Sequence, residues 1–288
     1  MPGAIPGTMP RAMRQILRTP MTVIGLVLVL VHVAVALCAP WIIPYGPSQL
    51  AGMPFEPPGD RFMLGTDVLG RDYLSRLIMG GRITLTVALA GVLIAIVAGA
   101  FLGLCAAWFG GLLDEVIMRL VDTKVAIPSI LLVGVLIPGF GQSVGVLIFV
   151  IALVYVAGVI RTVRAQALTI KPQSFVAASV LRGESSLSIM LREFLPNVAD
   201  LLCVEFAIRM SSAILLVSSL SFLGLGISPP TPDWGLMVSE GVGFIHTDPW
   251  LVIYPSIALC TLVVGLNLAT EGVANALGLD AARGMVKG

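Results

Sequence analysis

The chain has 288 residues, of which 57% are hydrophobic and 11% are charged, and its mean hydropathy is +1.01. Ordinary soluble domains carry about 25% charged residues, so the composition excludes a soluble globule. The formal net charge of +1 provides no basic field for a nucleic acid. Because a spanning helix needs about 20 apolar residues, we expect one all-α polytopic domain in a lipid bilayer.

The residue types of common active sites are scattered along the chain. Cysteines and histidines form no close pairs of the kind that bind metals, and neither HExxH nor GxSxG occurs. The lysines lack the following Ser or Thr of a nucleotide-binding P-loop. We therefore expect no catalytic residue, no metal and no bound cofactor, in a chain that is not itself an enzyme. The residues concerned are Cys38, Cys105, Cys203, Cys260, His32, His246, Lys124, Lys171 and Lys287.

Apolar runs predict six membrane-spanning helices, of which the first two are the clearest. Residues 21–43 follow a basic cytoplasmic segment, 1–20, and are too long for the apolar core of a typical secretory signal. They predict an uncleaved first span. Residues 83–109 contain no charged residue, and Gly99 and Gly103 form a small-xxx-small pair that lets another helix approach closely.

Four further helices are expected after residue 109. The third is expected to begin near Ile117, which places Arg119, Asp122 and Lys124 at its membrane entrance. A turn rich in Gly and Pro separates it from the fourth. The turn is expected at residues 138–143, and the last three helices at 144–163, about 201–232 and 249–270. The five-helix core then covers residues 83–275, and residues 276–288 form a cytoplasmic tail.

The basic residues favour an orientation with both termini in the cytoplasm. Six spans place both ends on one side, and short cytoplasmic connections carry an excess of Lys and Arg. With the termini inside, the basic residues outside all belong to one segment, 44–82, whose acidic residues balance them. Those outside are Arg61, Arg71, Arg76 and Arg82, and those inside are Arg11, Arg14, Arg18, Arg119, Lys124, Arg161, Arg164, Lys171, Arg182, Arg192, Arg283 and Lys287.

The longest cytoplasmic connection, residues 164–197, is expected to present side chains to a partner. Small residues at 177–179 predict a short helix that Gly183 ends, and Leu195-Pro196 would break the next one. Two short helices lying along the membrane follow from this pattern. An ordinary amphipathic connection has the same composition, so composition alone leaves both interpretations open.

The spacing in this loop resembles the EAA motif of the membrane subunits of bacterial ABC importers. In that motif a Gly is followed thirteen positions later by a Leu-Pro pair, which Gly183, Leu195 and Pro196 match. The family's loop forms a coupling helix that docks into a groove on an ATP-hydrolysing subunit. Ala178 matches the first of the motif's two alanines, but three positions differ: Ala177 stands at its glutamate, Ser179 at its second alanine and Glu193 at its isoleucine.

Three further strings are similar to the peptide and nickel branch of these permeases, at 64–77, 114–122 and 220–235. The resemblance covers about residues 15–280 and is closest to the C-type subunit of dipeptide and oligopeptide importers. It implies a type I importer fold in the bacterial inner membrane, and a second, homologous permease as partner. It also implies two ATP-binding subunits that hold ATP and Mg²⁺, and an extracytoplasmic substrate-binding protein.

Residues 65–82, the charged part of the outer segment 44–82, have two interpretations. Their balanced charge is typical of a solvated amphipathic helix that rests on the outer surface, whereas the resemblance implies a scoop beneath a docked binding protein. The residues expected to face that protein are Gly65, Asp67, Gly70, Arg71, Asp72 and Arg76.

Two features of the last third of the chain also have more than one interpretation. Glu205 and Arg209 are four residues apart, so they share a helix face, either as a gate in the translocation path or as a self-satisfied ion pair. Trp234 and Trp250 are expected to be aromatic residues of the membrane interface rather than substrate platforms.

The function expected from these observations is a permease subunit of an ATP-driven importer for peptides. A secondary transporter driven by an ion gradient is the alternative, although the second to fourth spans have no acidic residue away from their ends. Nickel chelates, opines and haem are the alternative substrates within the importer class.

Overall fold

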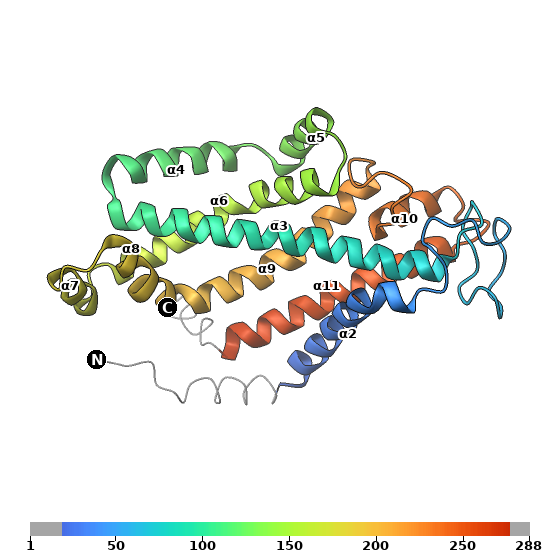
Figure 1. Ribbon diagram of the computed structural model, residues 1–288, viewed down its shortest axis with the longest axis horizontal. Helices are drawn as coiled ribbons and strands as arrows, with labels where there is room; N and C mark the ends of the chain where they lie inside the picture. Colours follow the sequence, from blue (N-terminus) through green and yellow to red (C-terminus); the bar gives the residue numbers. More distant parts are fainter. Residues whose placement is uncertain (1–18, 277–288) are drawn as a thin grey trace, which may run out of the picture.

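The computed structural model describes residues 19–276, and these form a bundle of helices without a strand in the described part. The predicted segment 1–20, apart from its last two residues, and the tail beyond Ala276 lie outside the described residues. Long helices run side by side along the molecule (Figure 1). They are α2 (Pro20–Ile42), α3 (Tyr73–Phe109), α6 (Val144–Ile170), α9 (Leu195–Phe222) and α11 (Trp250–Ala276), with shorter α4 (Gly111–Ala126), α5 (Ser129–Phe140), α7 (Ser174–Leu181), α8 (Ser186–Ile189), the π-helical turn η1 (Met190–Phe194) and α10 (Trp234–Val242).

The prediction of an all-α protein with six spans is confirmed, with one span broken. Five helices are long and apolar enough to cross a membrane, and α4 with α5, bent by 92°, makes a sixth when counted as one span. The break comes at Pro128, because proline forces the preceding residue into an extended conformation, and Ile127 has φ −88° and ψ 119°.

The third predicted helix begins earlier than expected. It starts at Gly111 rather than near Ile117, since Gly110 and Gly111 both adopt positive φ and turn the chain directly after α3. The expected position of Lys124 at the cytoplasmic entrance is therefore wrong. Lys124 lies in the last turn of α4, next to the middle of α6.

The helix α3 also begins well before the predicted start at residue 83. Asp72 caps its N-terminus by accepting a hydrogen bond from the Ser75 amide at 2.8 Å, so residues 73–82 belong to the helix and not to a separate outer segment. At a rise of about 1.5 Å per residue the helix is about 55 Å long, which exceeds the roughly 30 Å hydrocarbon core. It therefore protrudes from the bilayer, at the end where Asp72 lies.

Glycines let two helix pairs approach closely. The predicted contact of Gly99 and Gly103 is with α6: a Cβ added at Gly99 would lie 2.6 Å from Cβ of Val159. A second crossing joins α2 to α11, where a Cβ at Gly25 would lie 2.7 Å from the Gly265 carbonyl oxygen. Small residues at such crossings allow the close van der Waals packing that holds helices together in lipid.

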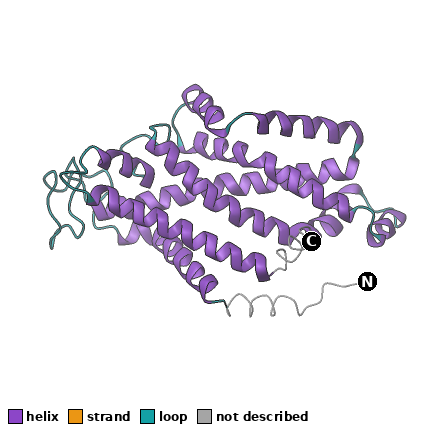
Figure 2. Cartoon of the chain, turned by 180° about the vertical axis from the view of Figure 1, so that it is seen from behind, coloured by secondary structure: helices purple, strands orange, loops and turns teal. Residues whose placement is uncertain are grey.

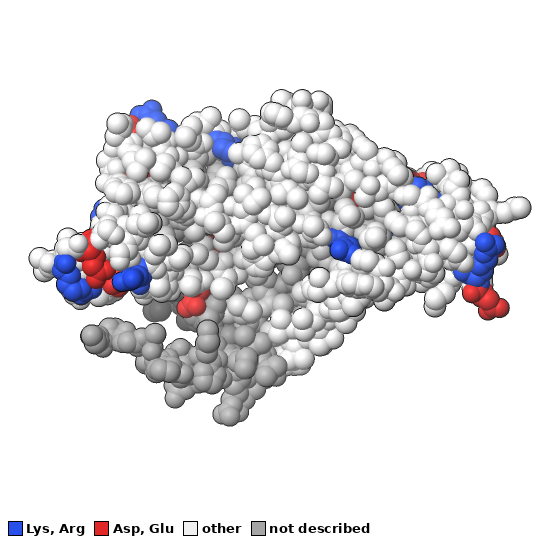
Figure 3. Space-filling view, viewed as in Figure 1, with Lys and Arg blue, Asp and Glu red and all other residues white. Residues whose placement is uncertain are grey.

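The loops gather at the two ends of the bundle (Figure 2), and most of the charged side chains visible in Figure 3 lie near those ends. One end carries α7 and α8, and the other carries residues 43–72 and the short helix α10 (Figure 1). The first turn of α2 and the last turn of α11 both point toward the end that carries α7 (Figure 1). We call that end the inner end and the opposite end the outer end.

Candidate functional site

The inner loop consists of two short helices joined by a glycine corner. The helix α7 ends at Leu181, and Gly183 adopts φ +72° just after it, the left-handed conformation that ends many helices. The chain then forms α8 and η1 and enters α9, with Pro196 in its first turn, where proline is tolerated because no intrahelical donor is lost. The first predicted short helix is present, but the expected break at Leu195-Pro196 is not, because residues Ser186–Phe222 form one continuous helical segment through η1.

Apolar contacts attach this loop to the ends of α3, α6 and α9. Val176, Ile189 and Phe194 are buried in one cluster, and the Phe194 ring meets the edge of Trp108 with centroids 5.7 Å apart. Lys171 donates hydrogen bonds to the carbonyl oxygen of Trp108, at 2.8 Å, and to that of the preceding residue, which are orphan acceptors at the end of α3. The loop is therefore packed firmly against the ends of the spanning helices.

A carboxylate from the far side of the loop anchors α7. Ser179 is buried and donates to Glu193 at 2.9 Å, while Arg182 donates to the Ser179 hydroxyl at 2.6 Å. Arg182 also donates to Glu184, and this hydrogen bond holds the pKa of Glu184 below its usual value. Glu193, at the position where the resemblance expects isoleucine, thus supplies the carboxylate that Ala177 lacks. The sequence spacing alone did not indicate this pairing.

The tip of α7 is exposed and apolar. Leu181 is 88% exposed and Val180 is 50% exposed, and Ala177 lies beside them on the exposed side. Among the other residues predicted for this loop, Gly183 and Pro196 are exposed, and Ala178 and Leu195 are half-buried. Exposed apolar groups at the end of a membrane protein indicate a surface for another protein.

Residues 43–72 are folded through turns, so that of the helix considered for residues 65–82 only residues 73–82 are helical, as the first turns of α3. Gly65 and Gly70 both have φ +76°. A side chain at Gly70 would collide with Gly52, whose carbonyl oxygen lies 2.2 Å from the ideal Cβ position, and the Gly52 amide donates to the Gly70 carbonyl at 3.0 Å. These contacts fold the segment back on itself.

A buried ion network joins this segment to α3 and α10. Asp67 accepts from Arg71 Nε at 2.5 Å and lies 3.2 Å from Arg76 Nε. Arg76 donates to Glu240 of α10 at 2.9 Å, and Arg71 lies 3.6 Å from the same carboxylate. Glu240 is a partner that the sequence analysis missed, because it lies far away along the chain.

This network corrects the expected placement of the outer residues. Asp67, Arg71, Asp72 and Arg76 are all at most 4% exposed, so their side chains do not face a docked protein. Asp72 caps α3, and the other three hold the segment in place. A buried ion pair is retained where several hydrogen bonds satisfy each charge, and Asp67 also accepts from the amides of Leu69 and Arg71.

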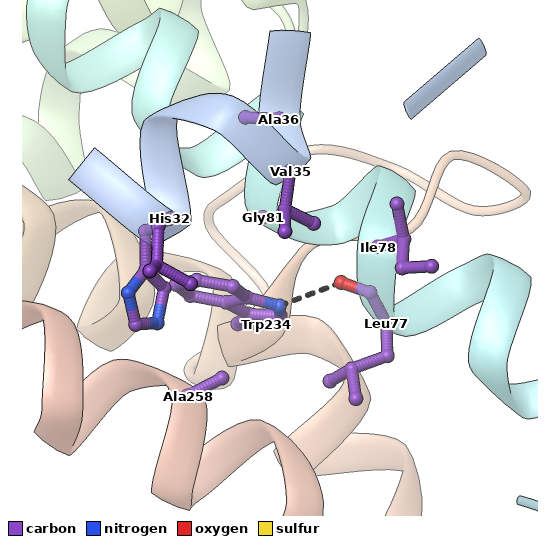
Figure 4. Close-up of a pocket in the computed structure, with 9 residues that line it drawn as sticks. His32, Val35, Ala36, Leu77, Ile78, Gly81, Trp234 and Ala258 are labelled. Atoms are coloured by element: carbon purple, nitrogen blue, oxygen red, sulfur yellow. Dashed lines mark hydrogen bonds between the residues drawn. The ribbon is translucent and has the colours of Figure 1, made fainter. Parts of the chain in front are cut away.

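The Trp234 side chain fills the space between α2, α3 and α11, which corrects its expected place at the membrane interface. It is 4% exposed and donates from Nε1 to the Leu77 carbonyl at 2.8 Å. Figure 4 shows its indole beside His32 and Ala258, next to a cavity of about 160 Å³. Gly81 makes room for the ring, since a Cβ there would lie 2.4 Å from Trp234 Cζ2.

The Glu205–Arg209 pair forms as predicted, within a larger cluster. The two side chains are about 15% exposed and make an i,i+4 ion pair. The Arg209 guanidinium lies against Gly158 and 6.0 Å from the centroid of the Tyr155 ring, both on α6. Lys124 donates to the carbonyl of Val154, the residue before Tyr155, and is close enough to Arg209 for the two cations to repel each other.

This cluster lies near the middle of α6 and α9. Arg209 is in the central turns of α9, and Tyr155 is well inside α6. It contains two cations and one carboxylate, and the Arg209 Nε is buried without a hydrogen-bond acceptor. Within the described residues, no group of three or more His, Cys, Asp or Glu side chains is placed to hold a metal ion.

The chain matches two protein families over most of its length. Residues 91–279 match the family described as the inner membrane component of binding-protein-dependent transport systems, and residues 9–58 match the N-terminal transmembrane domain of oligopeptide transport permease C.

Three curated relatives match the chain over most of its length. A di/tripeptide transport system permease protein of Pseudomonas aeruginosa is 38% identical, over 88% of this chain and 86% of the relative. A dipeptide transport system permease protein of Haemophilus influenzae is 36% identical, over 88% of each chain. An oligopeptide transport system permease protein of the same species is 32% identical, over 92% of this chain and 86% of the relative. The chain therefore belongs to the family of inner membrane components of binding-protein-dependent transport systems, as a multi-pass permease of the bacterial inner membrane.

Proposed function

We propose that this chain is the permease subunit of an ATP-driven importer that moves peptides into the bacterial cytoplasm. The names of the curated relatives support peptides as the substrate class. The proposed mechanism rests on the inner loop, which exposes an apolar tip at one side and packs against the ends of the spanning helices at the other. A rigid base is needed if a force applied at Leu181 is to move the spanning helices.

In this proposal the energy comes from two separate ATP-binding subunits, which hold ATP and Mg²⁺, and this chain binds no cofactor. The tip of α7 docks into a groove on one of those subunits. The inner end then faces the cytoplasm together with both termini, which agrees with the positive-inside pattern and with the direction of the first turn of α2 and the last turn of α11 (Figure 1).

The outer segment then receives the substrate-binding protein. Because Asp67, Arg71 and Asp72 are buried, contact falls to the exposed rim of the segment, where Met53 is 77% and Met63 is 70% exposed. The ion network around Asp67 holds this rim on α3 and α10, so that docking can be transmitted to those helices.

A second, homologous permease is proposed to complete the translocation path beside α4. The exposed face of α4 carries Glu115 and Arg119. The exposed Asp122 of the same helix pairs with Arg161 of α6 at 2.7 Å. Charged side chains that face lipid are costly, so this face is expected to border a water-filled path or the partner. The cluster at Lys124 and Arg209 adjoins the same helices, and its excess positive charge suits the carboxylate of a peptide in transit.

Copurification tests the coupling role. The tagged chain with Leu181→Glu is extracted from native membranes and compared with Met53→Glu, a matched exposed apolar position at the outer end. We expect Leu181→Glu to lose the ATP-binding subunits and their ATPase activity, while Met53→Glu keeps them. If the unaltered chain is recovered alone and its uptake collapses with the ion gradient, the secondary transporter is correct.

A second experiment tests the Glu205–Arg209 pair as a gate. Glu205→Gln is expected to leave assembly intact and to reduce peptide uptake, because the unpaired guanidinium would hold the path in one state. Glu115→Gln, which breaks the exposed i,i+4 pair with Arg119, is the control. Normal assembly and normal uptake in Glu205→Gln would end the gate proposal and leave a structural ion pair.

The substrate class is tested with the assembled transporter in vesicles. Uptake of a labelled dipeptide should require ATP and the binding protein, and should not be competed by nickel chelates, opines or haem. Competition by one of these ligands, with no peptide uptake, would replace the peptide assignment while keeping the importer.

A further inference from the structure

A groove between α2 and the helices α3, α9 and α11 is lined by apolar side chains except at Arg82 and Thr86. Its volume is about 350 Å³, and Val33, Leu37, Leu89, Phe206 and Leu262 are among its lining side chains. The helix α2 contacts α11 through its glycines but leaves this space on its other side. The groove therefore separates the first helix from the core of the bundle.

Arg82 is the one charged residue that lines the groove. Its side chain is half-exposed, and its guanidinium has no hydrogen-bond or ion-pair partner among the residues that the structure describes. Other arginines of the spans, such as Arg76, Arg164 and Arg209, are each paired with a carboxylate. A cation that has no partner within the described chain and lies beside an apolar groove is available to a counter-charge from outside the chain.

The depth of Arg82 indicates the source of that counter-charge. It lies nine residues after Tyr73, and among the lining residues of α3 it is the nearest to the outer end. Leu37, which also lines the groove, is about 8 Å from the outer end of α2 at about 1.5 Å per residue. From there the groove continues toward Val29 and Leu266, near mid-membrane. A cation thus stands at the outer mouth of an apolar channel that runs along the membrane normal.

We propose that this groove binds a glycerophospholipid of the outer leaflet, with its phosphate on Arg82 and one acyl chain between α2 and α3. A guanidinium pairs a phosphate through two parallel hydrogen bonds, and the apolar walls suit a hydrocarbon chain and not a free anion. The lipid would fill the gap that α2 leaves against the core, so it would stabilise the position of that helix.

The experiment is native mass spectrometry of the intact transporter, purified in mild detergent, with the bound phospholipid as the readout. Arg82→Gln is expected to lower lipid retention about tenfold, the effect of losing one charge-assisted hydrogen-bonded pair, and Arg82→Lys should retain part of it. Arg61→Gln, at an exposed arginine of the outer segment, is the control. Leu89→Trp fills the groove with the charge unchanged and should also expel the lipid.

A delipidated sample separates a lipid from other occupants. Added phosphatidylglycerol should raise the melting temperature of the unaltered transporter and not that of Arg82→Gln. An equal rise with inorganic phosphate alone would overturn the proposal in favour of a simple anion site. Unchanged lipid retention in both Arg82→Gln and Leu89→Trp would overturn it, as would a cross-link from Leu37→Cys to the second permease, because a protein helix would then occupy the groove.

Discussion

The two ends of the molecule use charged residues in opposite ways. At the inner end, Arg182 and Glu184 stay at the surface and pair with residues nearby in sequence, around an exposed apolar tip. At the outer end, Asp67 and Arg76 are buried and pair with each other, and Arg76 also pairs with Glu240, far along the chain. Charge in a connecting segment therefore does not by itself indicate a solvated surface, because a distant carboxylate can turn the same residues into a structural clamp.

The largest predicted effect comes from disrupting the buried ion network at the outer end. Asp67→Ala removes one of the two carboxylates that the buried Arg71 and Arg76 share and leaves only Glu240, and removing one partner of a buried ion pair costs about 3–5 kcal/mol. Thermal unfolding of the purified transporter measures the loss, with Arg61→Gln as the exposed control. An Asp67→Ala transporter as stable as the control would show that the network contributes nothing.

Glycine substitutions compare the two ends directly. Gly81→Ala puts a methyl group into the Trp234 ring, and overpacking of this kind costs about 1–3 kcal/mol. Gly183→Ala meets no neighbouring atom within 4 Å but must adopt φ +72°, which costs about 1 kcal/mol. Melting curves should therefore rank Gly81→Ala as the more damaging, and the reverse order would contradict the packing around Trp234.

At the inner end, the hydrogen bonds of Ser179 with Arg182 and Glu193 are expected to contribute less to stability than the ion network at the outer end. Ser179→Ala removes the acceptor for Arg182 and the donor to Glu193, a loss of about 1 kcal/mol. Ala177→Glu restores the family's glutamate at an exposed site where Glu193 already serves, so it should be close to neutral. ATPase activity stimulated by the binding protein, compared at equal assembly, tests both variants. Strong activation by Ala177→Glu would mean that Glu193 is not the substitute.

The smallest effect concerns Asp233, which caps α10 by accepting from the Gly235 and Leu236 amides. Burial raises the pKa of Asp233, so its charged form is disfavoured in the folded state. Asp233→Asn keeps the acceptor without the charge and should cost only a few tenths of a kcal/mol or stabilise, whereas Asp233→Ala loses about 1 kcal/mol.

The sign of the pH effect follows from that raised pKa. The folded state binds the Asp233 proton more tightly than the unfolded state, so stability at this site increases as the pH falls through the folded pKa. The melting temperature of the unaltered protein should therefore rise relative to Asp233→Asn as the pH is lowered from neutral. A constant difference between the two would contradict this.

The sequence by itself determined the class of protein, the helices and the place of the inner loop. Apolar length decides whether a segment can span a bilayer, and Gly183, Leu195 and Pro196 mark the loop through local backbone preferences. The Glu205–Arg209 pair was also predictable, since residues four apart on a helix meet.

Only the tertiary structure decided the boundary of α3, the burial of the outer charges, the supply of a carboxylate by Glu193 and the placement of Lys124 beside Arg209. The physical reason is the same in each case. Whether a charged residue is exposed, buried or part of a helix depends on a counter-charge or acceptor from another element, and contacts between distant parts of the chain leave no periodic signal in the sequence.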